Sequence, residues 1–336
     1  MAGKWTRRIG YSFLALLILL AVGISFTIGW RPIIGAKVRP LRTAKFDATP
    51  ARLARGEYLT NAVLVCFECH SASKPAAEGE APVMVSKKGA GAVFVEKGAF
   101  RIVAPNITPD AETGTASWPD DALARAIREG IGHDGRALFP IMPYLIYRSL
   151  PDEDVASVVV YLRTIGPAHN PLPKTHLPFM LGRLIQTAPQ PITDPVAPPD
   201  LSTPVKRGGF LAQVAGCGEC HTPTRGRPPK PVEGRAFSGG SDFDGIVSAN
   251  ITPDASGISY YDEALFLQVM RTGHVKVRAL KPPMPWWAYR NMTDEDLEAI
   301  YAYLRSLPPV HHIVDNQETP TQCKICGNKH GFGNRN

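Results

Sequence analysis

Cys66-Phe67-Glu68-Cys69-His70 is followed, later in this chain of 336 residues, by Cys217-Gly218-Glu219-Cys220-His221. Each stretch has the Cys-x-x-Cys-His pattern through which a c-type haem is attached covalently. The two thiols bond to the porphyrin, and the histidine that follows is placed to coordinate its iron. The sequence therefore predicts two covalently bound haem c groups, attached through Cys66, Cys69, Cys217 and Cys220, with His70 and His221 as iron ligands.

Other uses of paired cysteines fit this pattern less well. A zinc site would bring two Cys-x-x-Cys pairs to one metal, whereas each pair here has its own histidine and its own sequence repeat. A thioredoxin-like dithiol belongs in a βαβ context, and the sequence shows none. Haem attachment is the favoured interpretation.

The composition is that of a globular protein rich in loops. Hydrophobic residues make up 44% of the chain, and 32 prolines and 30 glycines require many turns. The net charge of +7 suits solubility, or docking to acidic partners or anionic lipid. Basic residues do not cluster with aromatic ones, so we expect no nucleic-acid partner.

The uncharged stretch 9–30 is long enough to cross a bilayer as one helix. Trp5, Tyr11 and Trp30 lie near its ends, where aromatic side chains anchor membrane helices. A cleaved signal peptide is the competing interpretation, but Ala21-Val22-Gly23 is a poor cleavage site. We expect an uncleaved transmembrane helix.

The orientation of this helix is not given by a plain count of basic residues. The basic residues around it are Lys4, Arg7 and Arg8 before the span, and Arg31, Lys37, Arg39, Arg42 and Lys45 after it. The plain count would place the C-terminal side in the cytoplasm. The charges nearest the span favour a cytoplasmic N-terminus, and bacterial haem attachment takes place outside the plasma membrane. We therefore expect a single-pass protein of the bacterial plasma membrane with its soluble domains on the periplasmic side.

The second half of the chain repeats the first. The recurring segments are Arg55-Gly56 and Arg207-Gly208, residues 106–110 and 250–254 (Asn-Ile-Thr-Pro-Asp), Met142-Pro143 and Met284-Pro285, residues 152–154 and 294–296, and residues 161–163 and 303–305. From the methionines onward the offset is 142 residues, with small gaps upstream. This is a duplicated domain, not a solenoid.

Each copy is predicted to consist of helices around a large loop. Val155, Val158, Val159 and Leu162 have helical spacing, as do Leu297, Ile300, Tyr301 and Leu304. Thr293 and Asp296 form a capping-box pattern at the start of the later helix. Further helices are expected from about Ala51, from near Pro204, and over 120–130 and 262–273, where a glycine ends each. The proline-rich stretch 166–204 should be an extended connector, with an apolar patch at 176–181 that packs on a module or docks a partner.

Met142 and Met284 are the predicted second axial ligands of the two irons. Each lies in a Pro-x-Met-Pro setting at a matched position, and flanking prolines fix a loop backbone. A methionine ligand gives the His/Met pair of electron-transfer cytochromes. The competing candidates are Met84, Met180, Met270 and Met292, which lack counterparts in the other copy, and His133 and His274, which recur. Asn106 and Asn250 match a glycosylation pattern but are interpreted as turn residues.

The tail contains Cys323-Lys324-Ile325-Cys326 followed by glycine, which argues against a third haem. A local disulfide is the favoured interpretation in an oxidising compartment. A metal site that includes His330 is the alternative, but it lacks an evident fourth ligand.

Together, the two haem motifs, the Asn-Ile-Thr-Pro-Asp segments and the Met-Pro segments resemble the cytochrome c subunits of membrane-bound periplasmic dehydrogenases of the alcohol, aldehyde or sugar-acid type. The resemblance covers residues 50–310 and implies an all-α fold of two class I cytochrome c-like domains in tandem. The implied organisation is a cytoplasmic N-terminus (1–8), a transmembrane helix (9–30), a linker (31–49), domain 1 (50–166), a proline-rich linker (167–203), domain 2 (204–310) and a tail (311–336).

The resemblance implies an electron-transfer subunit with no catalytic residue of its own. It would pass electrons from a periplasmic dehydrogenase to quinone or a terminal oxidase. The alternatives are a dihaem enzyme, such as a peroxidase or a thiosulfate-oxidising cytochrome, and a cytochrome c subunit of a terminal oxidase. An enzyme would need an open or switchable axial site, against which the matched methionines argue.

Overall fold

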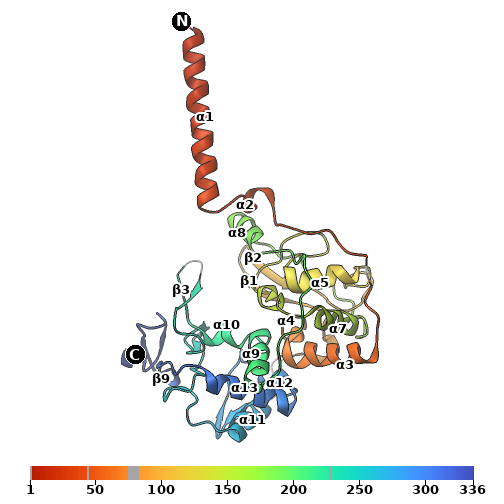
Figure 1. Cartoon of the computed structure of the whole chain (residues 1–336), viewed down its shortest axis with the longest axis vertical. Helices are drawn as coiled ribbons and strands as arrows, with labels where there is room; N and C mark the ends of the chain where they lie inside the picture. Colours follow the sequence, from red (N-terminus) through yellow and green to blue (C-terminus); the bar gives the residue numbers. More distant parts are fainter. Residues whose placement is uncertain (1, 44, 75–82, 227–228) are drawn as a thin grey trace.

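The computed structural model describes residues 2–43, 45–74, 83–226 and 229–336. Helix α1 (Ala2–Phe26) projects away from the rest of the molecule (Figure 1). Residues 4–26 are long and apolar enough to cross a membrane, and none of that span is buried by protein. The helix ends at Phe26, before the predicted boundary at residue 30, because Gly29 turns the chain with φ +68°. Trp30 folds back, and its Nε1 donates to Ser25 Oγ at 3.0 Å.

The first repeat follows the short helix α2 (Arg31–Ile34). Its elements are α3 (Pro50–Tyr58), the π-helical turn η1 (Leu59–Val63), α4 (Cys66–Cys69), the 3₁₀ turn η2 (Val85–Lys87), β1 (Ala92–Lys97), β2 (Phe100–Ala104), α5 (Asp120–Glu129), α6 (Tyr144–Tyr147) and α7 (Asp152–Leu162). The connector contains α8 (Phe179–Leu184) and the 3₁₀ turn η3 (Ile185–Thr187).

The second repeat has the same helix order. Its elements are α9 (Pro204–Val214), α10 (Cys217–His221), β3 (Thr224–Arg225), β4 (Lys230–Pro231), β5 (Asp242–Phe243), β6 (Ile246–Val247), α11 (Glu263–Thr272), β7 (His274–Val275), β8 (Arg278–Ala279), α12 (Trp286–Tyr289) and α13 (Asp294–Ser306). The tail forms β9 (Asp315–Gln322), β10 (Lys329–Gly331) and the 3₁₀ turn η4 (Gly333–Arg335).

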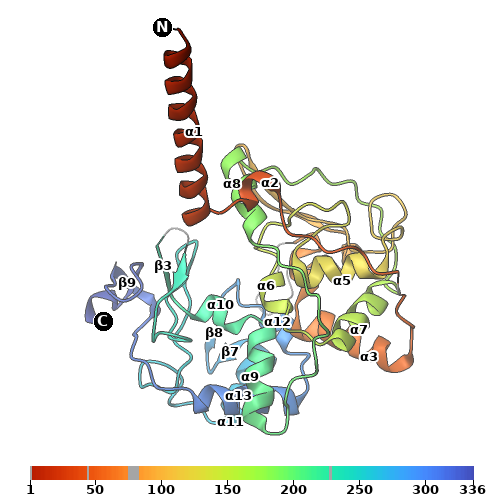
Figure 2. The same ribbon diagram turned by 45° about the horizontal axis from the view of Figure 1, so that its top comes forward.

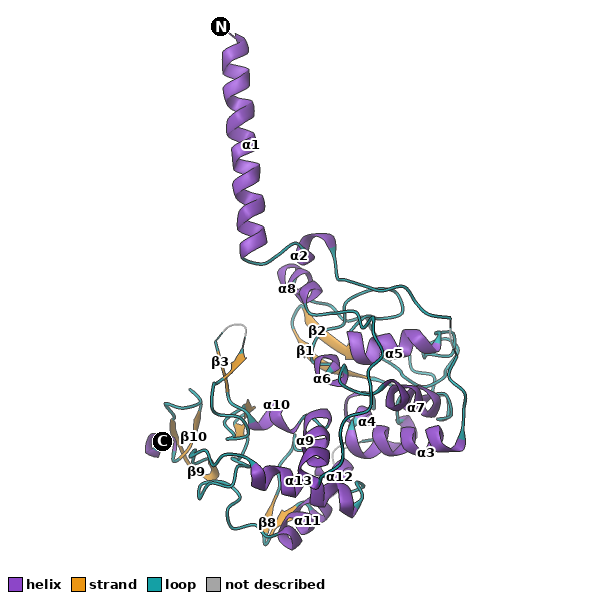
Figure 3. Ribbon diagram, in the orientation of Figure 1, coloured by secondary structure: helices purple, strands orange, loops and turns teal. Residues whose placement is uncertain are grey.

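Helices dominate the described residues, and the strands pair only as two-stranded antiparallel hairpins (Figure 3). The helical fold predicted from the sequence is therefore confirmed in its broad form, with short hairpins that the all-α prediction omitted. The predicted helix starts also agree closely with the structure. Thr49 and Thr203 are the N-caps of α3 and α9, and each side chain accepts a backbone N–H three residues on.

The first and last helices of each repeat cross at very short range. A Cβ added to Gly56 of α3 would lie 2.0 Å from the Ser157 carbonyl oxygen of α7. A Cβ added to Gly208 of α9 would lie 1.8 Å from the Ala299 carbonyl oxygen of α13. Only glycine allows backbones to approach so closely. This explains why a glycine recurs at this point in both copies.

Charged side chains fix the same crossing. Arg55 Nε lies 2.8 Å from Asp154, and Arg207 Nε lies 2.6 Å from Asp296, the corresponding pair in the second repeat. The predicted capping box at α13 is only half formed. Thr293 Oγ1 accepts the Asp296 amide at 3.2 Å, but the Asp296 carboxylate turns to Arg207 instead of capping in return.

The two repeats contact each other through equivalent elements. Helix α6 of the first repeat contacts α9 of the second, while α12 of the second contacts η1 of the first. In Figure 2, α6 and α12 are both seen where the two halves meet. Buried side chains of both repeats belong to one continuous hydrophobic cluster. Because each copy offers the same two surfaces, the contact has an approximate two-fold character.

The segment between α1 and α3 is docked on the first repeat by a buried ion-pair cluster. Arg39 Nε lies 2.8 Å from Glu129, and Arg39 Nη1 lies 2.7 Å from Asp121. All three side chains are less than a tenth exposed. Arg39, one of the five basic residues after the span, is thus neutralised inside the folded protein.

The connector is extended over much of its length, but it also contains helix α8. His176 pairs with Arg101 of β2 through two backbone hydrogen bonds of 2.8 and 2.9 Å. Of the predicted apolar patch, Phe179 and Met180 remain 78% and 64% exposed. These two side chains do not pack on either repeat.

Candidate haem-attachment sites

The histidine of each haem motif is held by the same hydrogen bond. His70 Nδ1 lies 2.7 Å from the Pro105 carbonyl oxygen, and His221 Nδ1 lies 2.7 Å from the Ala249 carbonyl oxygen. A carbonyl only accepts, so Nδ1 carries the proton and Nε2 keeps a free lone pair. Burial lowers the pKa of both histidines, which favours the neutral, metal-binding form. Both rings therefore have the tautomer and the fixed orientation that an iron ligand requires.

The paired cysteines do not have the character of a redox dithiol. None of the four haem-motif cysteines forms a disulfide in the structure. Burial raises the pKa of Cys66 and of Cys217 to about 12 each. A catalytic dithiol needs a lowered thiol pKa. The environment therefore disagrees with the thioredoxin-like alternative.

The residue before each motif turns the chain in the left-handed conformation. Val65 has φ +47° and Gly216 has φ +74°, and each caps the short helix that carries the cysteines. Glycine adopts this conformation freely, but a β-branched residue there is strained. A strained residue retained beside a candidate site indicates that the surrounding structure imposes the turn.

Met142 and Met284 both lie at the start of a short helix that is tied to the haem motif. Each methionine is partly buried and packs against the hydrophobic cluster. The Tyr147 hydroxyl of α6 donates to the Leu64 carbonyl at 2.6 Å. The Tyr289 hydroxyl of α12 donates to the Ala215 carbonyl at the same distance. These bonds hold each methionine segment beside the segment that leads into the cysteines.

Tyr147 and Tyr289 are parts of the site that the sequence motifs did not predict. Both are buried, and burial raises their pKa well above the ordinary value, so they remain neutral donors. The signal was present, because the two tyrosines are separated by the same 142-residue offset as the methionines.

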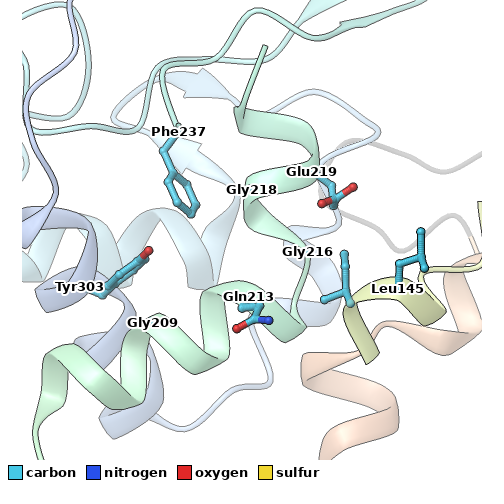
Figure 4. Close-up of a pocket in the computed structure, with 9 residues that line it drawn as sticks. Leu145, Gly209, Gln213, Gly216, Gly218, Glu219, Phe237 and Tyr303 are labelled. Atoms are coloured by element: carbon cyan, nitrogen blue, oxygen red, sulfur yellow. The ribbon is translucent and has the colours of Figure 1, made fainter. Parts of the chain in front are cut away.

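A cavity of about 350 Å³ opens beside the second haem motif. Figure 4 shows the Phe237 and Tyr303 rings on one side of it, Leu145 on the other, and Gly216 and Gly218 between them. Leu145 belongs to α6 of the first repeat. The first repeat therefore provides part of the wall of the second site.

Five of the six competing axial candidates have the following surroundings. His133 is exposed and stacks on the Trp118 ring with centroids 4.1 Å apart. His274 Nδ1 lies 2.9 Å from the Thr272 carbonyl oxygen, within its own turn. Met270 and Met292 are buried in the hydrophobic cluster, and Met180 lies on the exposed face of α8.

Asn106 and Asn250 form the turns that were predicted for them. Asn106 Oδ1 accepts from the Thr108 amide at 2.9 Å, and Asn250 Oδ1 accepts from the Thr252 amide at 2.9 Å. Both asparagines are buried, and their Nδ2 groups donate to carbonyl oxygens that follow the last helix of each repeat. A buried, fully bonded amide does not suit glycosylation. The turns also bring the two histidine-binding carbonyls into place, since Pro105 and Ala249 directly precede the asparagines.

Comparison with known proteins identifies the family. No family model matches the chain. A protein named "Diheme cytochrome c-type" from Cereibacter sphaeroides is 31% identical over 255 residues, which cover 73% of this chain and 82% of that protein. The chain belongs to the c-type cytochromes. Two further relatives of this cytochrome are subunits of dehydrogenases.

The fructose dehydrogenase cytochrome subunit of Gluconobacter japonicus is 32% identical over 293 residues, or 82% of this cytochrome and 57% of the relative. The cytochrome c subunit of the quinone alcohol dehydrogenase of Gluconobacter oxydans is 28% identical over 306 residues, or 86% and 61%. The predicted resemblance to the cytochrome c subunits of membrane-bound dehydrogenases is confirmed. This cytochrome spans only about three fifths of the length of these two subunits.

Proposed function

We propose that this cytochrome is a membrane-anchored dihaem electron-transfer subunit with two class I cytochrome c-like domains in tandem. The haem groups would be attached at Cys66 and Cys69 and at Cys217 and Cys220. Their irons would be bound by His70 with Met142 and by His221 with Met284. Bound in this way, haem supplies reversible one-electron chemistry at an iron that keeps both axial ligands.

The observation that carries this proposal is the duplication of one geometry. In each repeat the histidine Nδ1 lies 2.7 Å from a backbone carbonyl oxygen, and a tyrosine hydroxyl ties the methionine segment to the haem motif at 2.6 Å. A dihaem enzyme needs one iron with an open or exchangeable position, so its two sites should differ. Matched sites favour two electron carriers.

The reciprocal contact between the repeats supports transfer within one chain. Leu145 of the first repeat lines the cavity beside the second haem motif. Helix α12, which follows Met284, contacts the helical turn that leads to the first motif. The protein thus holds both haem motifs at one packed junction.

The anchor is proposed to be α1, with α2 and α8 at the membrane surface. Helices α2 and α8 contact each other and lie near the end of α1 (Figure 1). Ile34 of α2 and Phe179 of α8 are 66% and 78% exposed, and Ile28, which follows the end of α1, is 47% exposed. Apolar side chains next to the end of a spanning helix are stabilised at the bilayer interface. This arrangement supports an uncleaved anchor. The periplasmic side of the plasma membrane is proposed for the repeats from the haem motifs, since bacterial haem attachment takes place outside that membrane.

The proposed partners are a periplasmic dehydrogenase as electron donor and quinone or a terminal oxidase as acceptor. The relatives named above are subunits of fructose and alcohol dehydrogenases. Confinement of the donor and this cytochrome to one membrane surface would raise their effective concentration. Purification of the native membrane complex, with identification of its other polypeptides, tests the partnership directly.

Haem stoichiometry tests the dihaem assignment. We expect the intact mass to show two haem adducts, and the reduced protein to have the spectrum of low-spin His/Met haem without rapid carbon monoxide binding. A protein with one adduct, or with a high-spin haem that turns over peroxide or thiosulfate, would contradict the proposal.

Single replacements then test the axial ligands. Met142→Ala and Met284→Ala should each abolish His/Met character at one haem and make that iron bind carbon monoxide. Met180→Ala is the matched control, because Met180 is 64% exposed on α8 and should leave both spectra unchanged. An unchanged spectrum in Met142→Ala or Met284→Ala would remove that methionine from the ligand set.

A further inference from the structure

The C-terminal tail is folded onto the second repeat. Strands β9 and β10 form a hairpin whose turn contains Cys323 and Cys326. Asn316 of this hairpin exchanges two hydrogen bonds of 2.8 Å with the backbone of Val247. Asn328 Nδ2 donates to the Gly240 carbonyl oxygen at 2.7 Å. The tail therefore covers the loop that follows the second haem motif.

Four potential metal ligands converge between the hairpin and this loop. His312, Cys323, Cys326 and His330 each offer one ligand atom, and the four atoms lie within 4.8 Å of one another. The four residues are only 0–3% exposed. The fourth ligand, His312, is not evident in the sequence because it precedes the cysteines and lies close to the expected end of the second repeat. Both cysteines are free thiols, not the local disulfide expected from the sequence.

The two histidines are oriented to bind through Nε2. His312 Nδ1 donates to the Ser238 carbonyl oxygen at 2.9 Å, and His330 Nδ1 donates to the Gly331 carbonyl oxygen at 3.0 Å. His330 Nε2 is buried and has no hydrogen-bond partner among the described residues. An unpartnered buried nitrogen is costly unless something binds it. His312 Nε2 lies 3.4 Å from Cys323 Sγ.

We propose that these four residues bind one structural Zn²⁺ ion as a Cys₂His₂ site. In tetrahedral zinc, with its ordinary Zn–S and Zn–N lengths, a sulfur and a nitrogen ligand lie about 3.6 Å apart. The observed 3.4 Å separation agrees with this value. The Ile325 amide donates to Cys323 Sγ at 3.3 Å, which stabilises a thiolate there.

The packing around the site admits one ion and little else. A Cβ added to Gly240 would lie 2.7 Å from the Cys326 Cβ and 2.8 Å from the His312 Cε1. A two-iron cluster with histidines on one iron and cysteines on the other would separate the sulfur from the nitrogen ligands. The short distance from Cys323 to His312 places both on the same metal. A disulfide would leave two buried Nε2 atoms without a partner.

In the first repeat, an asparagine occupies the position equivalent to His312. Gly91 N donates to the His70 carbonyl oxygen, and Gly239 N donates to the His221 carbonyl oxygen, so the two glycines are equivalent. The residues directly before them, Ala90 and Ser238, are therefore equivalent as well. Asn170 Nδ2 donates to the Ala90 carbonyl oxygen at 2.9 Å, as His312 Nδ1 does to that of Ser238. A histidine keeps this hydrogen bond and adds a second nitrogen for a metal.

The ion would thus fix the tail to the backbone beside His221. His312 Nδ1 donates to the Ser238 carbonyl oxygen. The amide of the next residue, Gly239, donates to the His221 carbonyl oxygen at 2.7 Å. Zinc bound there contributes to folding of the second repeat and leaves the first unchanged. The inference does not depend on the proposed electron transfer.

Metal analysis of the full-length, haem-loaded protein tests the site. We expect about one zinc per chain, retained on dialysis, with an X-ray absorption edge that fits two sulfur and two nitrogen ligands. A zinc-free preparation from zinc-sufficient cells, with Cys323 and Cys326 joined as a disulfide in the unreduced mass, would overturn the proposal. Iron in excess of haem would overturn it as well.

Two variants with a matched control localise the metal. His312→Asn copies the first repeat and keeps a donor to Ser238, so the fold should survive while zinc content falls at least about tenfold. Cys326→Ser should have the same effect on zinc. His311→Asn alters the exposed neighbour and should keep zinc at the level of the unaltered protein. Full zinc retention in His312→Asn would contradict the ligand assignment.

Discussion

The first and second repeats share a helical frame but differ in what closes each of them. The helix crossings at Gly56 and Gly208 and the hydroxyls of Tyr147 and Tyr289 are the same in both. The first repeat, however, is covered by the segment after α1, whereas the second is covered by the C-terminal hairpin. The shared features hold the haem motifs. The covering segments differ because the segment after α1 lies beside the first repeat, whereas the C-terminal hairpin lies beside the second.

Helix α5 and helix α11 show this difference at equivalent positions. Asp121 and Glu129 of α5 are buried beneath Arg39. Aligned at Gly130 and Gly273, the glycines that end the two helices, the same positions in α11 are Ala264 and Thr272, which are uncharged and exposed. The buried carboxylates of α5 thus have no charged counterpart at these two positions of α11, and they pair with the segment that follows α1.

Arg39→Ala should give the largest loss of stability. It would leave two buried carboxylates without their partner, and breaking a buried pair in this way costs about 3–5 kcal/mol. Denaturant unfolding of the detergent-solubilised protein, followed at the first haem, measures the effect. A loss confined to the second repeat would show that the cluster does not stabilise the first.

Gly208→Ala should come next, at about 3 kcal/mol, the upper end of overpacking effects. The new Cβ would meet a backbone oxygen at 1.8 Å, and backbone cannot rotate away. Gly209→Ala is the control, because its Cβ would lie 3.2 Å from the Tyr303 ring, which can shift. Gly56→Ala should match Gly208→Ala if the crossings are equivalent. Equal midpoints for Gly208→Ala and Gly209→Ala would refute the close-approach explanation.

Gly216→Val tests the left-handed turn before the second motif. It would copy Val65 of the first repeat and should destabilise the second by about 1–2 kcal/mol. No atom lies within 4 Å of an added Cβ, so the cost is conformational, not steric. The unfolding midpoint measures this conformational cost. Val65→Gly is the reverse replacement and should relieve the same backbone strain in the first repeat. Unchanged stability in Gly216→Val would mean that the turn adapts to a β-branched residue.

Arg52→Ala should have the smallest effect. Arg52 Nε lies 2.7 Å from Glu153, whose side chain is 63% exposed. Exposed ion pairs contribute about 0–1 kcal/mol and are screened by salt. Unfolding at low and high salt should therefore separate this variant from Arg39→Ala. A loss as large as that of Arg39→Ala would mean that exposure is a poor guide to charge energetics in this protein.

Local sequence patterns predicted the helices well. The apolar spacing at Val155 to Leu162, the cap at Thr293, and the terminal glycines Gly130 and Gly273 all depend on neighbours within a few turns. The candidate haem-attachment and axial-ligand residues could be predicted for the same reason, since Cys-x-x-Cys-His and Pro-x-Met-Pro are contiguous motifs. Their roles as ligands stay predictions for the experiments described above.

The sequence by itself determined the duplication, the two haem motifs and the helix order, because these are written in contiguous residues and in a constant offset. Only the tertiary structure decided that Arg39 is a buried charge, that α6 and α12 join the repeats, and that His312 meets Cys323 and His330. The physical reason is that each of these contacts joins segments far apart in the chain. Their free energy depends on packing and burial, which no local pattern records.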